Sequence, residues 1–464
     1  MLPSKVINRI RVLSEWGMGS KAIAKSTELS MQLLYKDSLP SPAVIGSRIR
    51  ALNDQIHAVS QWQAPAQDCR WPVLVKDNIG VLGFRVTAGS FALKELRGVD
   101  AFCIRQLRKH GAVPFGKTSM SELAGFVSTR MPPGYSELGG HGINPIDPAL
   151  SPGGSSSGSA IAVAAGFCHS AIGTETHGSI VIPCIACGVV GIKPSVGLVS
   201  REGVIPISHT LDTPGAIAGT VSEAARLLEA IAGRDEQDEA TFEYPHAVDF
   251  HTDLGMDRSK VRIALATPDH QILDAEEREI LGKLIKAAGN HGIEIIEAPA
   301  RRFETYYKVI SSTEIQADFD HYLSKYGNEE TPRTFRDLVR LYEVRARHHP
   351  FGLDRLTDAL TFDPDLNNAG YAMALEKGVG NATTAIETML REYRAQAIMS
   401  VGFLPWWAMA RAPCVALPLA QRSTHAMMGI IVGCRRFEDR LAIDLAARLE
   451  KVTELIGLSR RIQS

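Results

Sequence analysis

The chain has 464 residues, of which 45% are hydrophobic and 22% are charged, a balance typical of a globular protein with a large core. Lysine and arginine together number 50, against 51 aspartates and glutamates, so the composition lacks the basic excess that nucleic-acid-binding proteins carry. The seven cysteines are too few and too scattered for a disulfide framework, which favours reduced thiols and a cytoplasmic location.

We expect a single domain made of four successive regions. The first, residues 1–60, is predicted to be helical, because Val6, Ile10 and Leu13 recur at helical spacing. Charged residues interrupt these apolar positions, so the segment does not resemble a signal peptide. No run in the chain approaches the roughly 18 apolar residues that a membrane span needs, and we expect no membrane contact.

The second region, residues 61–230, alternates short apolar strands with helical patterns and glycine-rich turns. The run from Pro72 to Val75 predicts a strand that ends at Lys76, and a helical pattern at 101–110 precedes another short apolar run. Such alternation is typical of an α/β sheet protein.

The last two regions differ from each other in pattern. Residues 231–400 are more charged and mostly helical. Residues 401–464 return to strand-like runs at 415–419 and 427–432, before a helical pattern at 437–455. We therefore predict that the C-terminal region rejoins the sheet.

Two segments rich in glycine and serine carry residues from which chemistry is expected. Residues 151–160 place three glycines and five serines before an apolar helical run. Taken alone, they form either a surface loop or a helix N-terminus, and no Gly-Lys-Ser/Thr ending supports a phosphate-binding loop. Residues 173–183 form a second such stretch, in which successive backbone N–H groups can converge on an anion, as an oxyanion hole requires.

Lys76, at the end of a very apolar strand, is a third candidate. A lysine held in apolar surroundings loses its charge more readily and can then act as a base near neutral pH. The alternative is a lysine whose stem is buried while its ammonium group reaches solvent or an ion-pair partner.

The order of these three pieces is similar to that in the amidase signature family. A lysine in a Val-Lys-Asp-Asn sequence comes first, a Gly-Gly-Ser-Ser-x-Gly loop second and a Gly-Thr-x-Thr-x-Gly-Ser loop third, with the family's spacing between Ser155 and Ser179. The resemblance covers about residues 40–230 well and residues 400–455 more weakly. It implies an α/β fold with a large, mixed, mostly parallel central sheet covered by helices on both faces.

The resemblance also implies roles for individual residues. Ser179 would be the nucleophile that forms an acyl-enzyme, Ser155, preceded by a cis peptide bond, the proton relay, and Lys76 the base. A serine hydroxyl needs such a base, and a bridging hydroxyl can accept and donate a proton in one step. The oxyanion hole would consist of the backbone N–H groups of Thr176, His177, Gly178 and Ser179.

The third segment departs from the commonest family pattern. Many members read GTDTGGSIR, whereas this chain has Glu175, His177 and Val181 in place of the aspartate, the first glycine of the pair and the arginine. The result is similar to the branch of bacterial peptide amidases, in which the position of His177 is usually acidic. We therefore expect hydrolysis of a peptide C-terminal amide or of a small primary amide, with release of ammonia or an amine. His177 either contacts the substrate or is simply tolerated.

Substrate contacts are predicted at two places in the chain. Ala124, Ser128 and Thr129 are candidates in the signature region. Trp406 and Trp407 are candidates in an aromatic run that, together with residues 231–400, is expected to line the pocket, since apolar and aromatic walls are usual in ligand sites.

No cofactor or metal is expected. Cys184 and Cys187 form a Cys-x-x-Cys pair without the second ligand pair that a zinc site needs. The expected partner is a small-molecule or peptide amide, with no nucleic acid and no membrane, and the protein would act as a monomer or homodimer. Two alternatives remain open. One is the ammonia-releasing component of a glutamine amidotransferase, which acts with partner subunits on aminoacyl-tRNA, and the other is a non-catalytic binding module that retains the fold.

Overall fold

The computed structural model describes residues 41–245, 249–257, 259–267, 273–345 and 349–458. The helix expected around Val6, Ile10 and Leu13 lies outside these residues. Within them, no helix combines the length and the apolar character needed to span a bilayer. All seven cysteines carry free thiols, and six of these side chains are buried.

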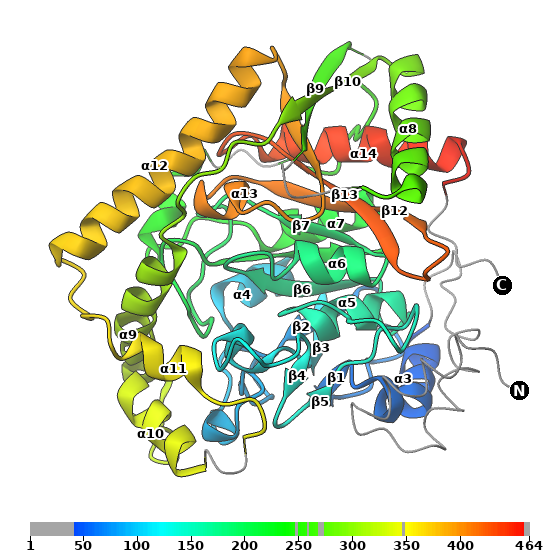
Figure 1. The fold of residues 1–464 in the computed structure, drawn as a ribbon. Coiled ribbons are helices and arrows are strands. Elements are labelled where there is room, and N and C mark those ends of the chain that lie inside the picture. Colours follow the sequence, from blue (N-terminus) through cyan, green and yellow to red (C-terminus); the bar gives the residue numbers. More distant parts are fainter. Residues whose placement is uncertain (1–40, 246–248, 258, 268–272, 346–348, 459–464) are drawn as a thin grey trace, which may run out of the picture.

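An 11-stranded sheet crosses the molecule (Figure 1). Its strands lie in the order β1-β3-β2-β6-β8-β7-β12-β13-β11-β9-β10. A separate two-stranded pair consists of β4 (Tyr135–Ser136) and β5 (Gly140–His141). The bounds of the sheet strands are β1 Val59–Trp62, β2 Pro72–Lys76, β3 Val113–Thr118, β6 Ser170–Glu175, β7 Val190–Lys193, β8 Thr213–Ala218, β9 Val261–Thr267, β10 Ile293–Pro299, β11 Ala397–Val401, β12 Cys414–Gln421 and β13 Met427–Gly433.

The helices vary from single turns to a 24-residue helix. Three short 3₁₀ helices lie at η1 (Phe91–Leu93), η2 (Glu122–Gly125) and η3 (Glu239–Phe242). The bounds of the α-helices are α3 Pro42–Ile56, α4 Phe102–Lys109, α5 Ser157–Ala164, α6 Val181–Ala186, α7 Val221–Ile231, α8 Ala275–Asn290, α9 Tyr307–Tyr326, α10 Phe335–Arg345, α11 Asp354–Ala359, α12 Ala369–Glu392, α13 Trp406–Met409 and α14 Asp439–Leu455.

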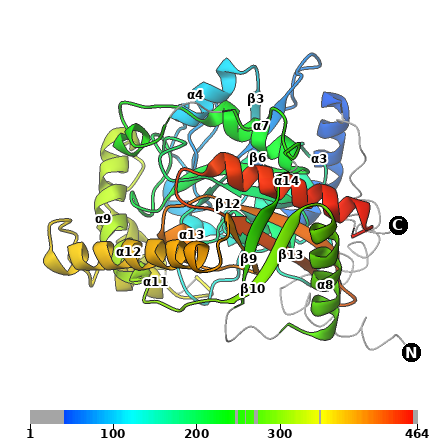
Figure 2. The same ribbon diagram turned by 90° about the horizontal axis from the view of Figure 1, so that it is seen from above.

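Helices cover both faces of the sheet, as the resemblance implied. Side chains of a strand point alternately to opposite faces. Along β2, Val73 and Val75 therefore join the core that α4, α7 and α14 cover, whereas Leu74 joins the core beneath α5, α6 and α12. Figure 2 shows α4, α7 and α14 on one side of the central strands and α12 and α13 on the other.

The sheet is mixed, as expected, but parallel pairing does not dominate it. Four of its neighbouring strand pairs are parallel and six are antiparallel. For β12 and β13 the reason is local, because only residues 422–426 join them and so short a connection returns the chain in the opposite direction. The expectation of a mostly parallel sheet is therefore wrong.

A third core lies under the helices α9 to α11. Phe319 of α9 and Tyr342 of α10 pack there with Leu93, Leu123 and Phe126. Leu123 lies in η2, only a few residues beyond the end of β3. This core therefore ties the helical region to the loops at the carboxyl end of the strands β2 and β3.

Candidate active site

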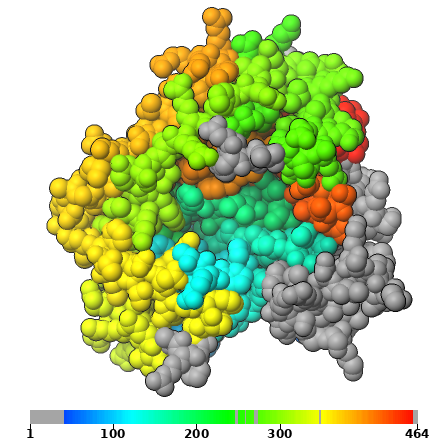
Figure 3. All heavy atoms as spheres, viewed as in Figure 1, coloured from blue at the N-terminus to red at the C-terminus, as the bar shows by residue number. Residues whose placement is uncertain are grey.

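Lys76 and Thr174 meet because β2 and β6 are parallel neighbours. The paired residues run in register from Val73 with Ser170 to Val75 with Ile172. The carboxyl ends of the two strands therefore lie at the same edge of the sheet. The side chains of Lys76 and Thr174, which come just after these paired residues, meet there. Figure 3 shows the blue-green segment that follows β5 recessed in a hollow of this face, beside the yellow helices.

Lys76 is fully buried and its ammonium nitrogen has three oxygen partners. Nζ donates to Ser155 Oγ at 2.8 Å, to Thr174 Oγ1 at 2.9 Å and to the Thr174 carbonyl at 3.1 Å. Burial lowers the pKa of Lys76 to about 7, although the charges of Asp212 and Glu175 oppose that shift. A lysine with this pKa exchanges a proton at neutral pH, so it meets the requirement for a general base.

Ser155 follows a cis peptide bond between Gly154 and Ser155, as the resemblance implied. Hydrogen bonds of the next residue join its loop to the loop of Ser179. The Ser156 backbone N–H donates to the Ser179 carbonyl at 3.0 Å, and Ser156 Oγ donates to the Thr174 carbonyl at 3.0 Å. These contacts bring together Lys76, Ser155 and the segment that carries Ser179, which lie far apart in the sequence.

The loop of Ser179 turns sharply between β6 and α6. Gly178 has φ +88°, a conformation that favours glycine, and a Cβ there would lie 2.5 Å from Ile182 Cδ1. The buried Glu175 carboxylate accepts hydrogen bonds from the backbone N–H groups of Ile180 at 2.7 Å and Val181 at 3.1 Å. This carboxylate therefore fixes the chain directly after Ser179, which is itself partly exposed.

Asp212 holds the other end of the same loop. Its Oδ1 accepts a hydrogen bond from Thr176 Oγ1 at 2.5 Å, and its Oδ2 accepts from the backbone N–H groups of Ile207 at 2.7 Å and Ser208 at 2.9 Å. Burial raises the pKa of Asp212 to about 6, with the hydrogen bonds opposing the shift. No sequence pattern predicted a role for Asp212 or Thr174, because no local pattern reveals which groups these two side chains contact in the folded chain.

His177 carries the side chain closest in sequence to Ser179 that could bear a charge. Its imidazole ring packs 4.5 Å from the ring of Tyr307 and 4.9 Å from that of Phe403, centroid to centroid. Burial, with the charge of Arg355 acting in the same direction, lowers the pKa of His177 to about 4. The ring is therefore neutral at pH 7.

The residues predicted to contact substrate lie in different surroundings in the structure. Trp406 and Trp407 lie in the hydrophobic core with exposed fractions of 2% and 1%, so neither ring offers an open surface, and their contact with substrate stays a prediction. Short helix α13 turns both rings inward, and Trp407 packs directly over Gly433. Phe403, from the same aromatic run, is the ring that approaches the loop of Ser179.

Ser128, which is buried, and Thr129, which is exposed, both bind Asp354, the first residue of α11. Thr129 donates to Asp354 through its backbone N–H at 3.0 Å and its hydroxyl at 2.7 Å. Ser128 Oγ donates to the same carboxylate and to the Phe351 carbonyl at 2.7 Å. Both side chains therefore anchor the start of α11, and their contact with substrate stays a prediction.

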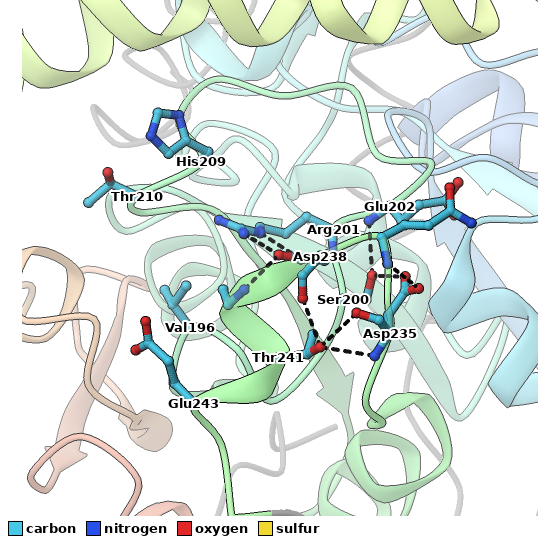
Figure 4. A network of polar contacts seen from close by, with 12 residues as sticks. Val196, Ser200, Arg201, Glu202, His209, Thr210, Asp235, Asp238, Thr241 and Glu243 are labelled. Atoms are coloured by element: carbon cyan, nitrogen blue, oxygen red, sulfur yellow. Dashed lines mark hydrogen bonds and ion pairs between the residues drawn. The ribbon is translucent and has the colours of Figure 1, made fainter. Parts of the chain in front are cut away.

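Ala124 lines a cavity of about 170 Å³ that adjoins the site. Thr174 and Thr176 form part of its wall, and α9 contributes Asp318 and Tyr322. On the far wall, Arg201 binds Asp238 through its backbone N–H at 2.8 Å and its Nε at 2.9 Å, and the two side chains point at one another in Figure 4. The charged residues of this wall are thus largely paired with each other.

Two groups among the described residues have the donor atoms to hold a metal ion, and neither includes Lys76, Ser155 or Ser179. One comprises His209, Glu314 and Asp318, and the other Glu229, Asp249 and His251. In the first group, His209 already forms an ion pair with Asp318 at 2.9 Å.

Comparisons with known proteins show which proteins the chain resembles. The family model named Amidase matches residues 70–376. A probable amidase of Arabidopsis thaliana is 33% identical over 393 residues, which are 82% of this chain and 76% of the relative. A glutamyl-tRNA(Gln) amidotransferase subunit of Prochlorococcus marinus is 34% identical over 323 residues, which are 68% of this chain and 65% of the relative.

Solved structures include a protein whose fold resembles that of this chain over nearly its whole length. The native peptide amidase of Stenotrophomonas maltophilia has a TM-score of 0.83 at 29% identity, with coverage of 92% of this chain and 94% of that one. The chain therefore belongs to the amidase signature family and is an amidohydrolase.

Proposed function

We propose that this amidohydrolase cleaves the carboxamide of a peptide C-terminus or of a small primary amide through an acyl-enzyme on Ser179. The observation that carries the proposal is the buried contact of 2.8 Å between Lys76 Nζ and Ser155 Oγ, made by a lysine with a pKa of about 7. The likeness to a peptide amidase supports the choice of substrate.

Acylation uses the three residues in sequence. Neutral Lys76 takes the proton of Ser155 while Ser155 takes that of Ser179, and Ser179 Oγ bonds to the amide carbon. The electron pair of the carbonyl moves to its oxygen, which the backbone N–H groups of residues 176–179 stabilise. The C–N bond then breaks, and the nitrogen leaves as ammonia with the proton that Lys76 returns through Ser155.

Deacylation repeats the same transfers with water. The water gives a proton through Ser155 to Lys76 and bonds to the acyl carbon. The bond from that carbon to Ser179 Oγ breaks, and Ser179 regains the proton. The products are a carboxylic acid and ammonia, and the three residues return to their starting state.

The deciding experiment measures ammonia release by the purified chain alone, on a panel of peptide amides and small aliphatic and aromatic primary amides. Hydrolysis of these substrates supports the proposal. Activity that appears only with added partner subunits supports the amidotransferase alternative. A chain that neither hydrolyses any amide nor reacts with a fluorophosphonate probe is a binding module.

The proposal includes a location in the cytoplasm. The seven free thiols support it, because a reducing compartment keeps cysteines in that state.

Asp212→Asn should move the pH dependence of kcat/KM to lower pH. The Asp212 carboxylate is the charge that most favours the ammonium form of Lys76, so its removal lowers the pKa of Lys76 from its value of about 7. The rising limb of the profile then begins at a lower pH. Asp318→Asn is the matched control, because Asp318 lines the same cavity but is not among the charges that act on Lys76. An unmoved limb in Asp212→Asn would contradict this coupling.

A further inference from the structure

Three aromatic rings from distant parts of the chain gather beside Ser179. His177 lies in the loop between β6 and α6, Tyr307 is the first residue of α9, and Phe403 follows β11. The rings of His177 and Tyr307 are tilted by 32°, and those of His177 and Phe403 by 73°. All three side chains are only partly buried. We call these three residues the aromatic cluster.

The aromatic cluster is in direct contact with the loop of the nucleophile. His177 precedes Ser179 by two residues, and the intervening Gly178 lies under Phe403. A Cβ added to Gly178 would meet Phe403 Cε2 at 3.3 Å. A group bonded to Ser179 Oγ therefore emerges within reach of these rings.

The aromatic cluster presents an uncharged surface at neutral pH. Burial lowers the pKa of His177 to about 4 and raises that of Tyr307 to about 12. Phe403 has no ionisable group. Uncharged aromatic rings that keep part of their surface exposed favour contact with an apolar or aromatic group, by offset stacking or edge-to-face packing.

We propose that His177, Tyr307 and Phe403 form an acyl subsite that selects amides with an aromatic acyl group, such as aryl carboxamides and peptide amides that end in an aromatic residue. The inference rests on the proposed function. When ammonia is the leaving group, the acyl portion is the only large part of the substrate that can lie against a wall beside Ser179.

The separations within the aromatic cluster set the way in which a substrate ring binds. Centroid distances of 4.5 and 4.9 Å leave no space between the His177 ring and either of its two neighbours. A substrate ring therefore packs on their exposed faces and edges. Removal of one ring takes away one packing partner, so the selectivity should fall without being abolished.

The test compares two substrates that differ only in the terminal side chain, N-acetyl-phenylalaninamide and its cyclohexylalanine analogue. The measured quantity is the ratio of their kcat/KM values. We expect the ratio to favour the aromatic substrate, and His177→Ala and Tyr307→Leu each to lower it roughly 3- to 10-fold. His177→Phe, which keeps an aromatic ring, should preserve it. His110→Ala, an exposed histidine at the end of α4, is the matched control and should leave the ratio unchanged.

The use of a ratio separates selectivity from general damage to the oxyanion loop, because such damage slows both substrates alike. Equal losses on both substrates, or a wild-type ratio near one, would overturn the inference. Labelling of wild-type Ser179 by a fluorophosphonate, together with hydrolysis of either amide, keeps the proposed function intact in that case. A wild-type chain that hydrolyses neither amide would instead overturn the proposed function itself.

Discussion

Ser179→Ala should reduce carboxamide turnover by at least roughly 10⁴-fold and abolish covalent labelling by a fluorophosphonate. The loss is large because the oxyanion N–H groups and Lys76 remain but no oxygen is left to form the acyl bond. The fold should survive, since the contact that Ser179 makes to Ser156 uses its backbone carbonyl and not its side chain. Mass spectrometry of the labelled protein measures the adduct directly.

Ser157→Ala is the matched control for this experiment. Ser157 is the first residue of α5, is fully buried, and its Oγ has no hydrogen-bond partner among the described residues. Its replacement should leave both the labelling and the turnover in place. A probe adduct found on any residue other than Ser179 would contradict the assignment of the nucleophile.

The sequence predicted those parts of the fold whose signal is local. The apolar run that ends at Lys76 is strand β2, and the pattern at 437–455 closely matches helix α14. The pairing of strands was not predictable in the same way. β7 pairs with β12, whose residues lie more than two hundred positions further along the chain, and no local pattern specifies such a contact. The prediction that most strand pairs are parallel was therefore wrong.

The candidate site, like the fold, has one part that the sequence predicted and another that it did not. The meeting of Lys76 and Ser155 follows from motifs whose order and spacing resemble those of a known family. The support from Asp212 and Glu175 depends on which backbone N–H groups the folded loops present, and a carboxylate in a sequence does not reveal that. Aromatic residues pose the same difficulty, because Phe403 and Trp407 belong to one run yet face the site and the core respectively.

Lys76→Ala should lower kcat/KM by roughly 10²- to 10⁴-fold and remove the pH dependence that the wild type shows near neutrality. Only the neutral amine accepts a proton from Ser155, and burial holds the pKa of Lys76 at about 7. In the wild type, kcat/KM should therefore rise as the pH increases through about 7 and level off above it. The limb belongs to the coupled Lys76 and Ser155 pair, so its midpoint need not equal the pKa of either group alone.

His177 provides the control for this assignment, because an ordinary histidine titrates close to the same pH. Its pKa of about 4 places the ionisation of this ring well below the expected limb. The limb should thus persist in His177→Gly and be missing from the residual activity of Lys76→Ala, which depends on the oxyanion hole alone. Profiles of kcat/KM between pH 5 and pH 9 for the three proteins distinguish the two groups. If the limb vanishes in His177→Gly and survives in Lys76→Ala, then Lys76 is not the base.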